Sequence, residues 1–170
     1  MRILTVIFFL FLFFPGWGQE NEYAIKAAYI EKFARFTQWD NITQIDTFRI
    51  TVLGKNPFKG ELDNLAENYS IHNKKVSVRY AKTIDQLKKT HLLFVAASED
   101  KHLTTIIARA KQMNVLIVGE TKKCAEAGGH FVFFIANNKT IGFNVNPQRI
   151  KKSGLDTDIY LMSYGEVVKY

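Results

Sequence analysis

Hydrophobic residues in this 170-residue chain follow two different spacings, and these spacings predict most of its elements. Short apolar runs rich in valine, isoleucine and phenylalanine are typical of strands. The predicted strands are residues 48–54, 75–80, 91–97, 115–118, 131–135 and 140–145. Apolar residues three or four positions apart predict helices between them. The predicted helices are residues 22–39, 59–67, 83–87, 99–113, 124–127, 146–153 and 156–168.

The alternation of strands and helices predicts the fold class. Strands 91–97 and 115–118 are apolar at nearly every position, which is typical of strands covered on both faces. We therefore expect a three-layer α/β/α sandwich with a mostly parallel sheet. Asn137 and Asn138 lie between the strands 131–135 and 140–145, and asparagine tolerates tight-turn conformations. These two strands predict an antiparallel hairpin at one edge of the sheet.

The first 18 residues have a different pattern from the rest. Met1-Arg2 is followed by an apolar run over residues 3–14, which Pro15-Gly16-Trp17-Gly18 interrupts. A run of this length is too short to cross about 30 Å of hydrocarbon as a helix. A basic start, an apolar middle and small residues at the end are typical of a secretory signal peptide. We predict a signal peptide over residues 1–18 and a domain over residues 19–170, with an uncleaved anchor as the alternative.

The composition is that of a globular domain with a basic surface. Hydrophobic residues make up 47% of the chain and the net charge is +7. The lysine pairs are dispersed along the sequence, whereas a nucleic-acid-binding protein gathers basic residues on one face. The dispersed pairs are Lys74-Lys75, Lys88-Lys89, Lys122-Lys123 and Lys151-Lys152. We expect no nucleic-acid partner, while attraction to an anionic membrane or an acidic partner is left open.

The chain shows no pattern of catalytic or metal-binding residues. Its single cysteine, Cys124, excludes an intramolecular disulfide and is expected to be half-exposed in a helix or turn. The four histidines have no metal-ligand spacing, and nucleophile-elbow and phosphate-loop motifs are missing. Of these histidines, His91 and His130 stand at strand starts and are candidates for pH sensitivity. The sequence therefore predicts a non-enzymatic protein without a cofactor or metal.

The loops that follow the predicted parallel strands are the candidate binding site, because ligands meet open α/β sheets at the carboxyl ends of the strands. The candidate residues are Gly54, Asn56, Pro57, Phe58, Ser98 and Glu99, with Gly119 and Glu120 at the same edge. We expect Asn56 and Phe58 to present a polar and an aromatic group. Ser98 is expected to open a helix whose first N–H groups suit an anion or carbonyl group. The alternative is that these residues only shape turns and caps.

The aromatic residues of the first predicted helix have a similar ambiguity. They are Tyr29, Phe33, Phe36 and Trp39. Aromatic residues at helical spacing are typical of a core, but they exceed what one helix face must bury. A partner-facing share is therefore left open.

Six short phrases, in order, carry a resemblance to a known family. They are Lys26-Ala27-Ala28-Tyr29-Ile30, Val52-Leu53-Gly54-x-x-Pro57-Phe58, Leu93-Phe94-Val95, Ala127-Gly128-Gly129, Ile141-Gly142-Phe143-x-Val145-Asn146 and Ser153-Gly154-Leu155. Over residues 22–168 the chain resembles the YfiR-like family of exported bacterial proteins. The resemblance implies a periplasmic domain that restrains a membrane-bound diguanylate cyclase, or a sensor module related to those of sensor kinases. Family members often carry cysteine pairs, so the single cysteine here departs from the family and removes any disulfide switch.

Two interpretations of function follow. The first is a periplasmic regulatory or sensing domain whose partner is the periplasmic part of a membrane signalling protein, either a diguanylate cyclase or a sensor kinase. The alternative is a small-molecule-binding periplasmic carrier or sensor. Self-association as a homodimer is compatible with both. An enzyme is the weakest interpretation, because no acid–base or nucleophile arrangement is visible.

Overall fold

The structure is a computed structural model that describes the backbone of residues 17–169 and the side chains of residues 22–169. Residues 1–16 of the predicted signal peptide lie outside the described residues. The predicted cleavage position after Gly18 falls in the first turn of helix α1 (Trp17–Arg35).

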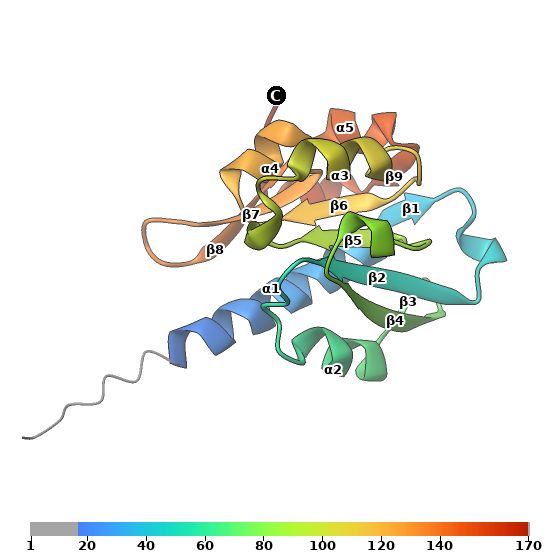
Figure 1. Ribbon diagram of the computed structural model, residues 1–170, viewed down its shortest axis with the longest axis horizontal. Helices are drawn as coiled ribbons and strands as arrows, with labels where there is room; N and C mark the ends of the chain where they lie inside the picture. Colours follow the sequence, from blue (N-terminus) through green and yellow to red (C-terminus); the bar gives the residue numbers. More distant parts are fainter. Residues whose placement is uncertain (1–16, 170) are drawn as a thin grey trace, which may run out of the picture.

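A mostly parallel sheet of eight strands forms the centre of the described chain (Figure 1). The strands are β2 (Thr47–Leu53), β3 (Ser70–Ile71), β4 (Lys74–Ala81), β5 (Leu92–Val95), β6 (Leu116–Gly119), β7 (Phe131–Ile135), β8 (Ile141–Val145) and β10 (Glu166–Val167). Their order is β10-β8-β7-β6-β5-β2-β4-β3. The predicted hairpin is present as the antiparallel pair β7 and β8, and β10 adds one parallel strand beyond it. At the other edge, β3 pairs antiparallel with β4.

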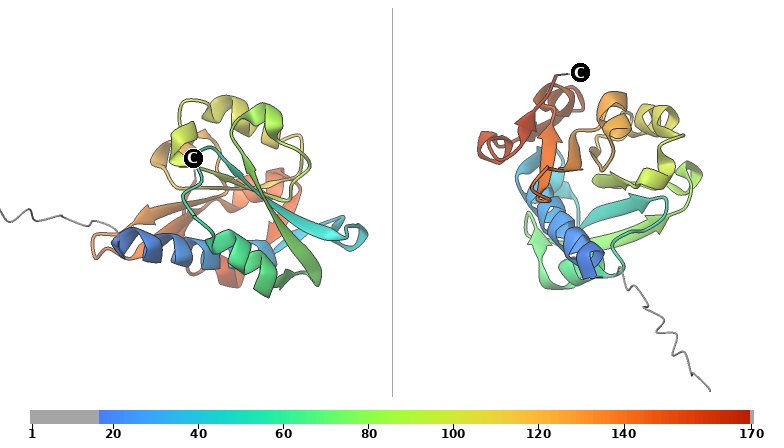
Figure 2. Two further views of the ribbon diagram at one scale, coloured as in Figure 1. Left: turned by 60° about the horizontal axis from the view of Figure 1, so that its bottom comes forward. Right: turned by 90° about the vertical axis from the view of Figure 1, so that its left-hand side faces the viewer.

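Helices cover both faces of this sheet, which confirms the predicted α/β sandwich (Figure 2). Helices α1 and α2 (Glu61–Asn68) lie on one face, and α3 (Leu103–Ala110) and α4 (Lys122–Ala127) lie on the other. Strand β5 shows the alternation, because Leu92 and Phe94 pack into the core on the α1 face while Leu93 and Val95 pack on the α3 face. The short helices α5 (Pro147–Lys152) and α6 (Ile159–Met162) each bury one aliphatic side chain in the core on the α1 face.

A small second sheet occupies residues that were predicted to lie in the helices 22–39 and 156–168. The predicted helix 22–39 ends at Arg35, and β1 (Thr37–Trp39) pairs antiparallel with β9 (Leu155–Thr157). The Thr37 and Thr157 hydroxyls are 3.0 Å apart in a buried hydrogen bond. The predicted helix 156–168 is therefore wrong, since that segment contains the end of β9, then α6 and β10. This pairing joins residues far apart in sequence, so local spacing did not indicate it.

The aromatic residues of the first predicted helix are mainly core residues. Phe33 is fully buried and stacks on Phe131 with ring centroids 4.2 Å apart. Trp39, now in β1, is also buried, and Tyr29 packs against the same cluster through an edge contact with Phe143. A buried phenylalanine replaced by alanine costs about 3–5 kcal/mol in folded proteins. These side chains stabilise the fold and leave little aromatic surface for a partner.

Candidate functional site

The candidate loops lie where the chain direction switches across the sheet. After β2 the chain enters α2 on the α1 face, whereas after the neighbouring strand β5 it proceeds to α3 on the opposite face. In open α/β sheets this topological switch point is the usual place for a ligand. The sequence prediction thus placed its residues at the position that the topology favours.

Gly54 and Ser98 are in direct contact at this switch point. The Lys55 N–H donates to the Ser98 hydroxyl at 2.9 Å. Gly54 has a φ of +97°, and a Cβ atom on it would lie 2.4 Å from the Ser98 oxygen and 2.8 Å from Cγ of Glu99. Glycine is required here both for its conformation and for its size. The two loops are therefore packed together as one surface, and the protein's own side chains fill the crevice between them.

Two expectations about this surface are wrong. Phe58 is fully buried between Tyr23 and Phe94, with ring centroids at 5.3 and 4.8 Å, so it presents no aromatic group. Ser98 does not open a helix, because it lies in the 3-10 turn Ala97–Glu99 and α3 begins only at Leu103. Its hydroxyl accepts the Lys55 amide instead of a helix N–H.

The other candidate residues differ in exposure: Asn56 and Ser98 are exposed, whereas Glu99 is mostly buried. Asn56 is exposed, and its Oδ1 accepts the Phe58 N–H at 2.9 Å, which fixes the turn around Pro57. The Glu99 side chain is only 14% exposed, with its Oε2 3.3 Å from Nδ1 of His102. Ligand or partner contact by Gly54, Asn56, Pro57, Ser98 and Glu99 stays a prediction.

A buried ion pair beside these loops was not anticipated from the sequence. Lys26 of α1 lies 2.8 Å from Glu120, which follows β6, and 2.6 Å from Glu22. The Lys26 and Glu120 side chains are only 5% and 7% exposed. Glu120 also accepts the Tyr23 hydroxyl at 2.9 Å and the Ala97 N–H at 3.1 Å. The pKa of the Tyr23 hydroxyl is raised, mainly by burial and secondly by the negative charge of Glu120. The spacing of Glu22 and Lys26 was the available signal, since residues four apart share a helix face.

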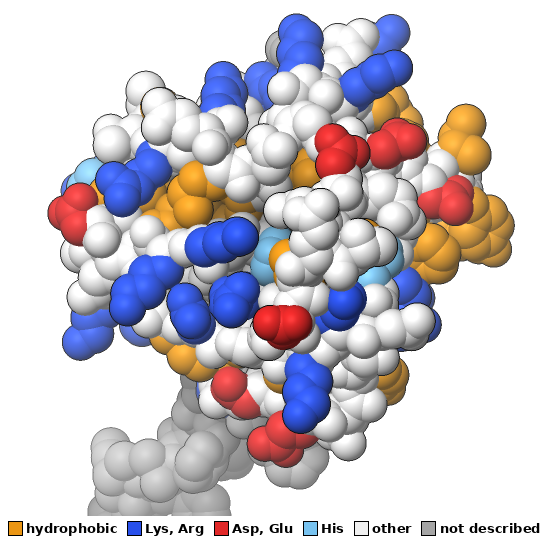
Figure 3. Space-filling model, turned by 90° about the vertical axis from the view of Figure 1, so that its right-hand side faces the viewer, with side chains coloured by type: hydrophobic (Ala, Val, Ile, Leu, Met, Phe, Trp, Pro, Cys, Tyr) orange, Lys and Arg blue, Asp and Glu red, His pale blue; other side chains and the backbone are white. Residues whose placement is uncertain are grey.

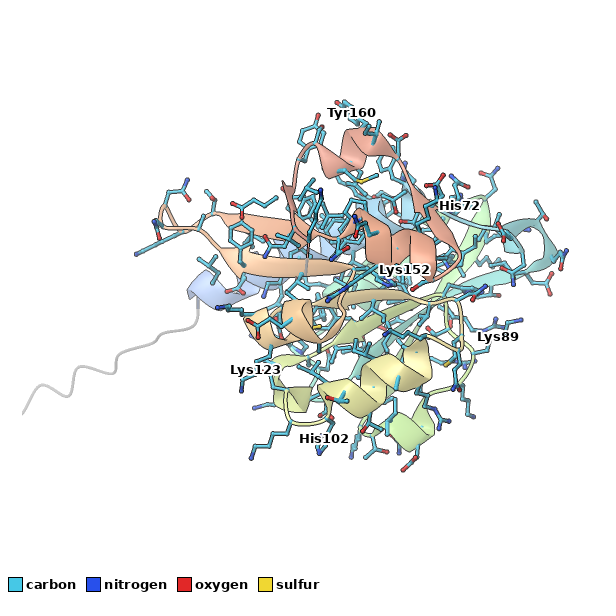
Figure 4. All side chains as sticks on the ribbon, turned by 90° about the horizontal axis from the view of Figure 1, so that it is seen from above. His72, Lys89, His102, Lys123, Lys152 and Tyr160 are labelled. Carbon is cyan, nitrogen blue, oxygen red and sulfur yellow. The ribbon has the colours of Figure 1, made fainter. Side chains whose placement is uncertain are left out.

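An exposed apolar patch lies near the C-terminus of the chain. Ile159, Tyr160 and Tyr164 are 81%, 61% and 62% exposed. The two tyrosine rings meet edge to face with centroids 5.1 Å apart. Tyr160 stands at the outer surface, away from the sheet (Figure 4). Grouped exposed apolar side chains of this kind often mark interaction sites.

The buried histidines occupy matching positions at the amino ends of strands. His91 Nδ1 accepts the Arg49 N–H at 2.8 Å, and His130 Nδ1 accepts the Ile117 N–H at 3.1 Å. Burial lowers the pKa of His91 to about 4 and that of His130 to about 3. Both rings are therefore neutral near pH 7, with the proton on Nε2.

Cys124 is buried rather than half-exposed as expected. Burial raises the pKa of its thiol to about 12. Within residues 17–169, no group of three His, Cys, Asp or Glu side chains is arranged to hold a metal ion. None of the described helices has the length and hydrophobicity needed to cross a membrane.

Comparison with protein families tests the resemblance to YfiR-like proteins that the six sequence phrases suggested. A family model described as YfiR/HmsC-like matches residues 23–166. The chain belongs to the YfiR/HmsC-like family. The resemblance to YfiR-like proteins is thereby confirmed over nearly all of the described residues. No curated relative matches the chain.

Two solved structures share the fold of this family member at low sequence identity. One is a conserved domain protein from Vibrio cholerae, with a TM-score of 0.57 and 10% identity. The other is an ABC domain in complex with L-Trp from Streptococcus pneumoniae, with a TM-score of 0.57 and 11% identity. Each match covers 86% of this chain and 60% of the solved chain. At this identity the likeness concerns the fold alone.

Proposed function

We propose that this chain is a non-enzymatic periplasmic domain that regulates or informs a membrane signalling protein by binding its periplasmic part. The partner would be a diguanylate cyclase or a sensor kinase. The family match over residues 23–166 carries this proposal. The predicted signal peptide over residues 1–18 supports export to the compartment where such a partner is accessible.

The paired loops at the carboxyl edge are the proposed contact surface. Asn56 and Glu99 come from different loops, which the Lys55–Ser98 hydrogen bond and the packing against Gly54 hold together. A surface held in one conformation loses little entropy when a partner binds. The loops therefore present two polar side chains in a fixed arrangement.

The test begins with capture of the partner. Immobilised domain 19–170 should retain a cyclase or kinase from a membrane extract, identified by mass spectrometry, and the purified partner should rebind. The double variant Asn56→Ala/Glu99→Ala should lose this binding while its free energy of unfolding stays within about 1 kcal/mol of the parent. The matched control Glu67→Ala/Asn137→Ala changes exposed residues elsewhere and should bind normally.

Two results would change the proposal. If the loop variant still binds and Ile159→Ser/Tyr160→Ser does not, the contact surface is the exposed patch near the C-terminus. If the domain captures no membrane signalling protein, the regulatory function is contradicted.

A small-molecule sensor is the second candidate function. The location of the loops at the topological switch point favours it, and one solved structure of this fold holds L-Trp. The pocket beside Glu120 at this edge measures about 240 Å³, below the ~300–1,000 Å³ of typical ligand pockets. Calorimetry with amino acids, L-tryptophan included, tests this candidate. Saturable binding that Asn56→Ala/Glu99→Ala abolishes would favour it over partner binding.

A further inference from the structure

A groove runs along the α3 face of β2 and β4, from the residues before β2 to the last residues of β4. Leu53 and Ala81 pack into the core on the α3 face, so alternate residues of these strands face the same side. Arg49 and Arg79 occupy such positions, with Arg79 directly opposite Thr51 in the register. Two adjoining hollows of about 400 and 460 Å³ share Arg79 and Lys88. We call their combined lining the amino-edge groove, because it begins at Asp46 and Arg49 near the amino end of β2.

The charge of this groove is strongly one-sided. Four cations line it: Arg49, Arg79, Lys88 and Lys89. Asp46 is the one carboxylate among the described residues that line it. No ion pair joins the four cations to a carboxylate within residues 17–169. Figure 3 shows lysine and arginine side chains gathering on the face where the strands begin, and Figure 4 places Lys89 at this end.

A buried ring next to Arg49 and stacked on Phe48, that of His91, has an unpartnered donor. The ring of His91 is 3% exposed and is fixed to β2, because Arg49 N–H donates to its Nδ1 and His91 N–H donates to the Arg49 carbonyl oxygen. Its remaining donor, Nε2–H, has no hydrogen-bond partner among the described residues. A buried donor without a partner costs about 1–3 kcal/mol. The charges that act on the ring are those of Arg49 and Lys89, both of which line the groove.

His130, at the matching position before β7, has hydrogen-bond partners for both of its ring nitrogens. It makes the same reciprocal pair of hydrogen bonds with Ile117, and its Nε2 lies 3.0 Å from the Ser153 hydroxyl. The missing partner at His91 is thus not a general property of this strand-end arrangement.

We propose that the amino-edge groove binds a small ligand that carries phosphate groups. A guanidinium forms two parallel hydrogen bonds to a phosphate, and Arg49 and Arg79 place two of them along one groove. Lys88 and Lys89 add charge without a fixed geometry. Phosphate is favoured over a single carboxylate because it carries close to two negative charges at neutral pH, which better offsets an excess of positive charge. The groove shares no lining residue with the proposed partner surface, although Ala81 at its far end accepts the Gly54 N–H of that surface at 2.8 Å.

Calorimetric titration of domain 19–170 with sodium pyrophosphate, at matched ionic strength, tests the site. We expect saturable binding of one ligand per chain. The variant Arg49→Gln/Arg79→Gln should bind pyrophosphate at least tenfold more weakly. If it fails to fold, Lys88→Gln/Lys89→Gln is the second test, because both of these lysines are exposed. The control Lys101→Gln/Lys123→Gln removes the same charge elsewhere and should change affinity less than twofold. Absence of saturable binding, or an equal loss in the control, overturns the proposal.

Vesicles distinguish a lipid headgroup from a soluble phosphate compound. Sedimentation with phosphatidylcholine vesicles that contain phosphatidic acid, whose headgroup is a phosphate monoester, is compared between the same two double variants. Binding that Arg49→Gln/Arg79→Gln loses and the control keeps assigns the headgroup as a ligand. Pyrophosphate binding without such vesicle binding assigns a soluble phosphate. Equal vesicle binding by both variants, together with no pyrophosphate binding, contradicts the site.

Discussion

The carboxyl edge of the sheet and the amino-edge groove differ in whether their charged side chains have partners of opposite charge. At the carboxyl edge, Lys26 is buried but compensated by Glu22 and Glu120. In the amino-edge groove, four cations have no carboxylate partner among residues 17–169, and the buried Nε2–H of His91, next to Arg49, has no acceptor among these residues. The buried Lys26–Glu120 ion pair links α1 to the end of β6. The cations of the groove make no such link to the described residues, which leaves them available for the ligand proposed above. The carboxyl edge is therefore the one whose charges stabilise the domain.

Acid should act mainly through the amino edge, and this is the largest effect we expect. The pKa values of His91 and His130 are lowered to about 4 and about 3 by burial, while unfolded histidine has a pKa near 6.5. As the pH falls, the unfolded chain binds protons on these histidines before the folded chain does. The stability that the two neutral histidines contribute is therefore present above about pH 6.5 and is lost as the pH falls towards about 4 and about 3. Each histidine contributes at most about 1.4 kcal/mol per pH unit, so the two together should lose about 4 kcal/mol between pH 7 and pH 5.

Denaturant unfolding at pH 7 and pH 5 measures this loss. His91→Asn keeps an acceptor for the Arg49 N–H but cannot titrate, so its loss should be about half that of the parent. An unchanged loss in this variant would show that His91 is not responsible.

Removing the buried carboxylate at the carboxyl edge should be the next largest effect. Glu120→Ala leaves the Lys26 ammonium and the Tyr23 hydroxyl without their shared partner, at a cost of about 3 kcal/mol in unfolding free energy. Glu120→Gln keeps an acceptor and should cost less. Asp46→Ala, an exposed carboxylate of the amino edge, should stay within about 0.5 kcal/mol. Equal losses at both edges would remove the contrast between them.

The packing of the two candidate loops predicts a smaller loss. Gly54→Ala forces a side chain into positive φ and against Ser98, which should cost about 1–3 kcal/mol. Gly60→Ala is the control, because a Cβ at that position meets nothing within 4 Å. Thermal unfolding of both variants checks the difference. A Gly54→Ala protein as stable as the control would mean that the loops can separate freely.

The unpaired arginines predict the smallest effect. Like charges in the amino-edge groove repel each other, so raising NaCl from 20 to 500 mM should stabilise the parent by about 0.5 kcal/mol through screening. Arg79→Gln should reduce this gain without lowering stability in low salt. A variant that is clearly less stable would indicate that Arg79 has a structural partner.

The sequence predicted the inner strands well, because buried strands carry their signal locally. The boundaries of β7 match those predicted, and the apolar runs around 91–97 and 115–118 contain β5 and β6. The position of the candidate loops after the carboxyl ends of parallel strands also followed from the predicted parallel sheet. Both results depend on short-range patterns that a strand carries wherever it lies.

What the sequence did not predict depends on distant partners. β1 is stable as a strand only because β9 pairs with it, and Phe58 is buried because Tyr23 and Phe94 surround it. The basic residues look dispersed along the sequence, but the register of β2 and β4 brings Arg49 and Arg79 into one groove. Their shared face could have been inferred from the period-two pattern only if the strands had been known to be neighbours.

The thiol of Cys124 has a practical consequence for studying this protein. It is 1% exposed beside Gly119, where a Cβ atom would come within 2.3 Å of its sulfur. With a pKa of about 12, only about one thiol in 10⁴ is ionised at pH 8, and maleimides react with the ionised form. A cysteine introduced on the surface, for example Asn137→Cys, should therefore be the single position that takes a fluorophore. The otherwise unaltered domain can then report partner or phosphate binding by fluorescence.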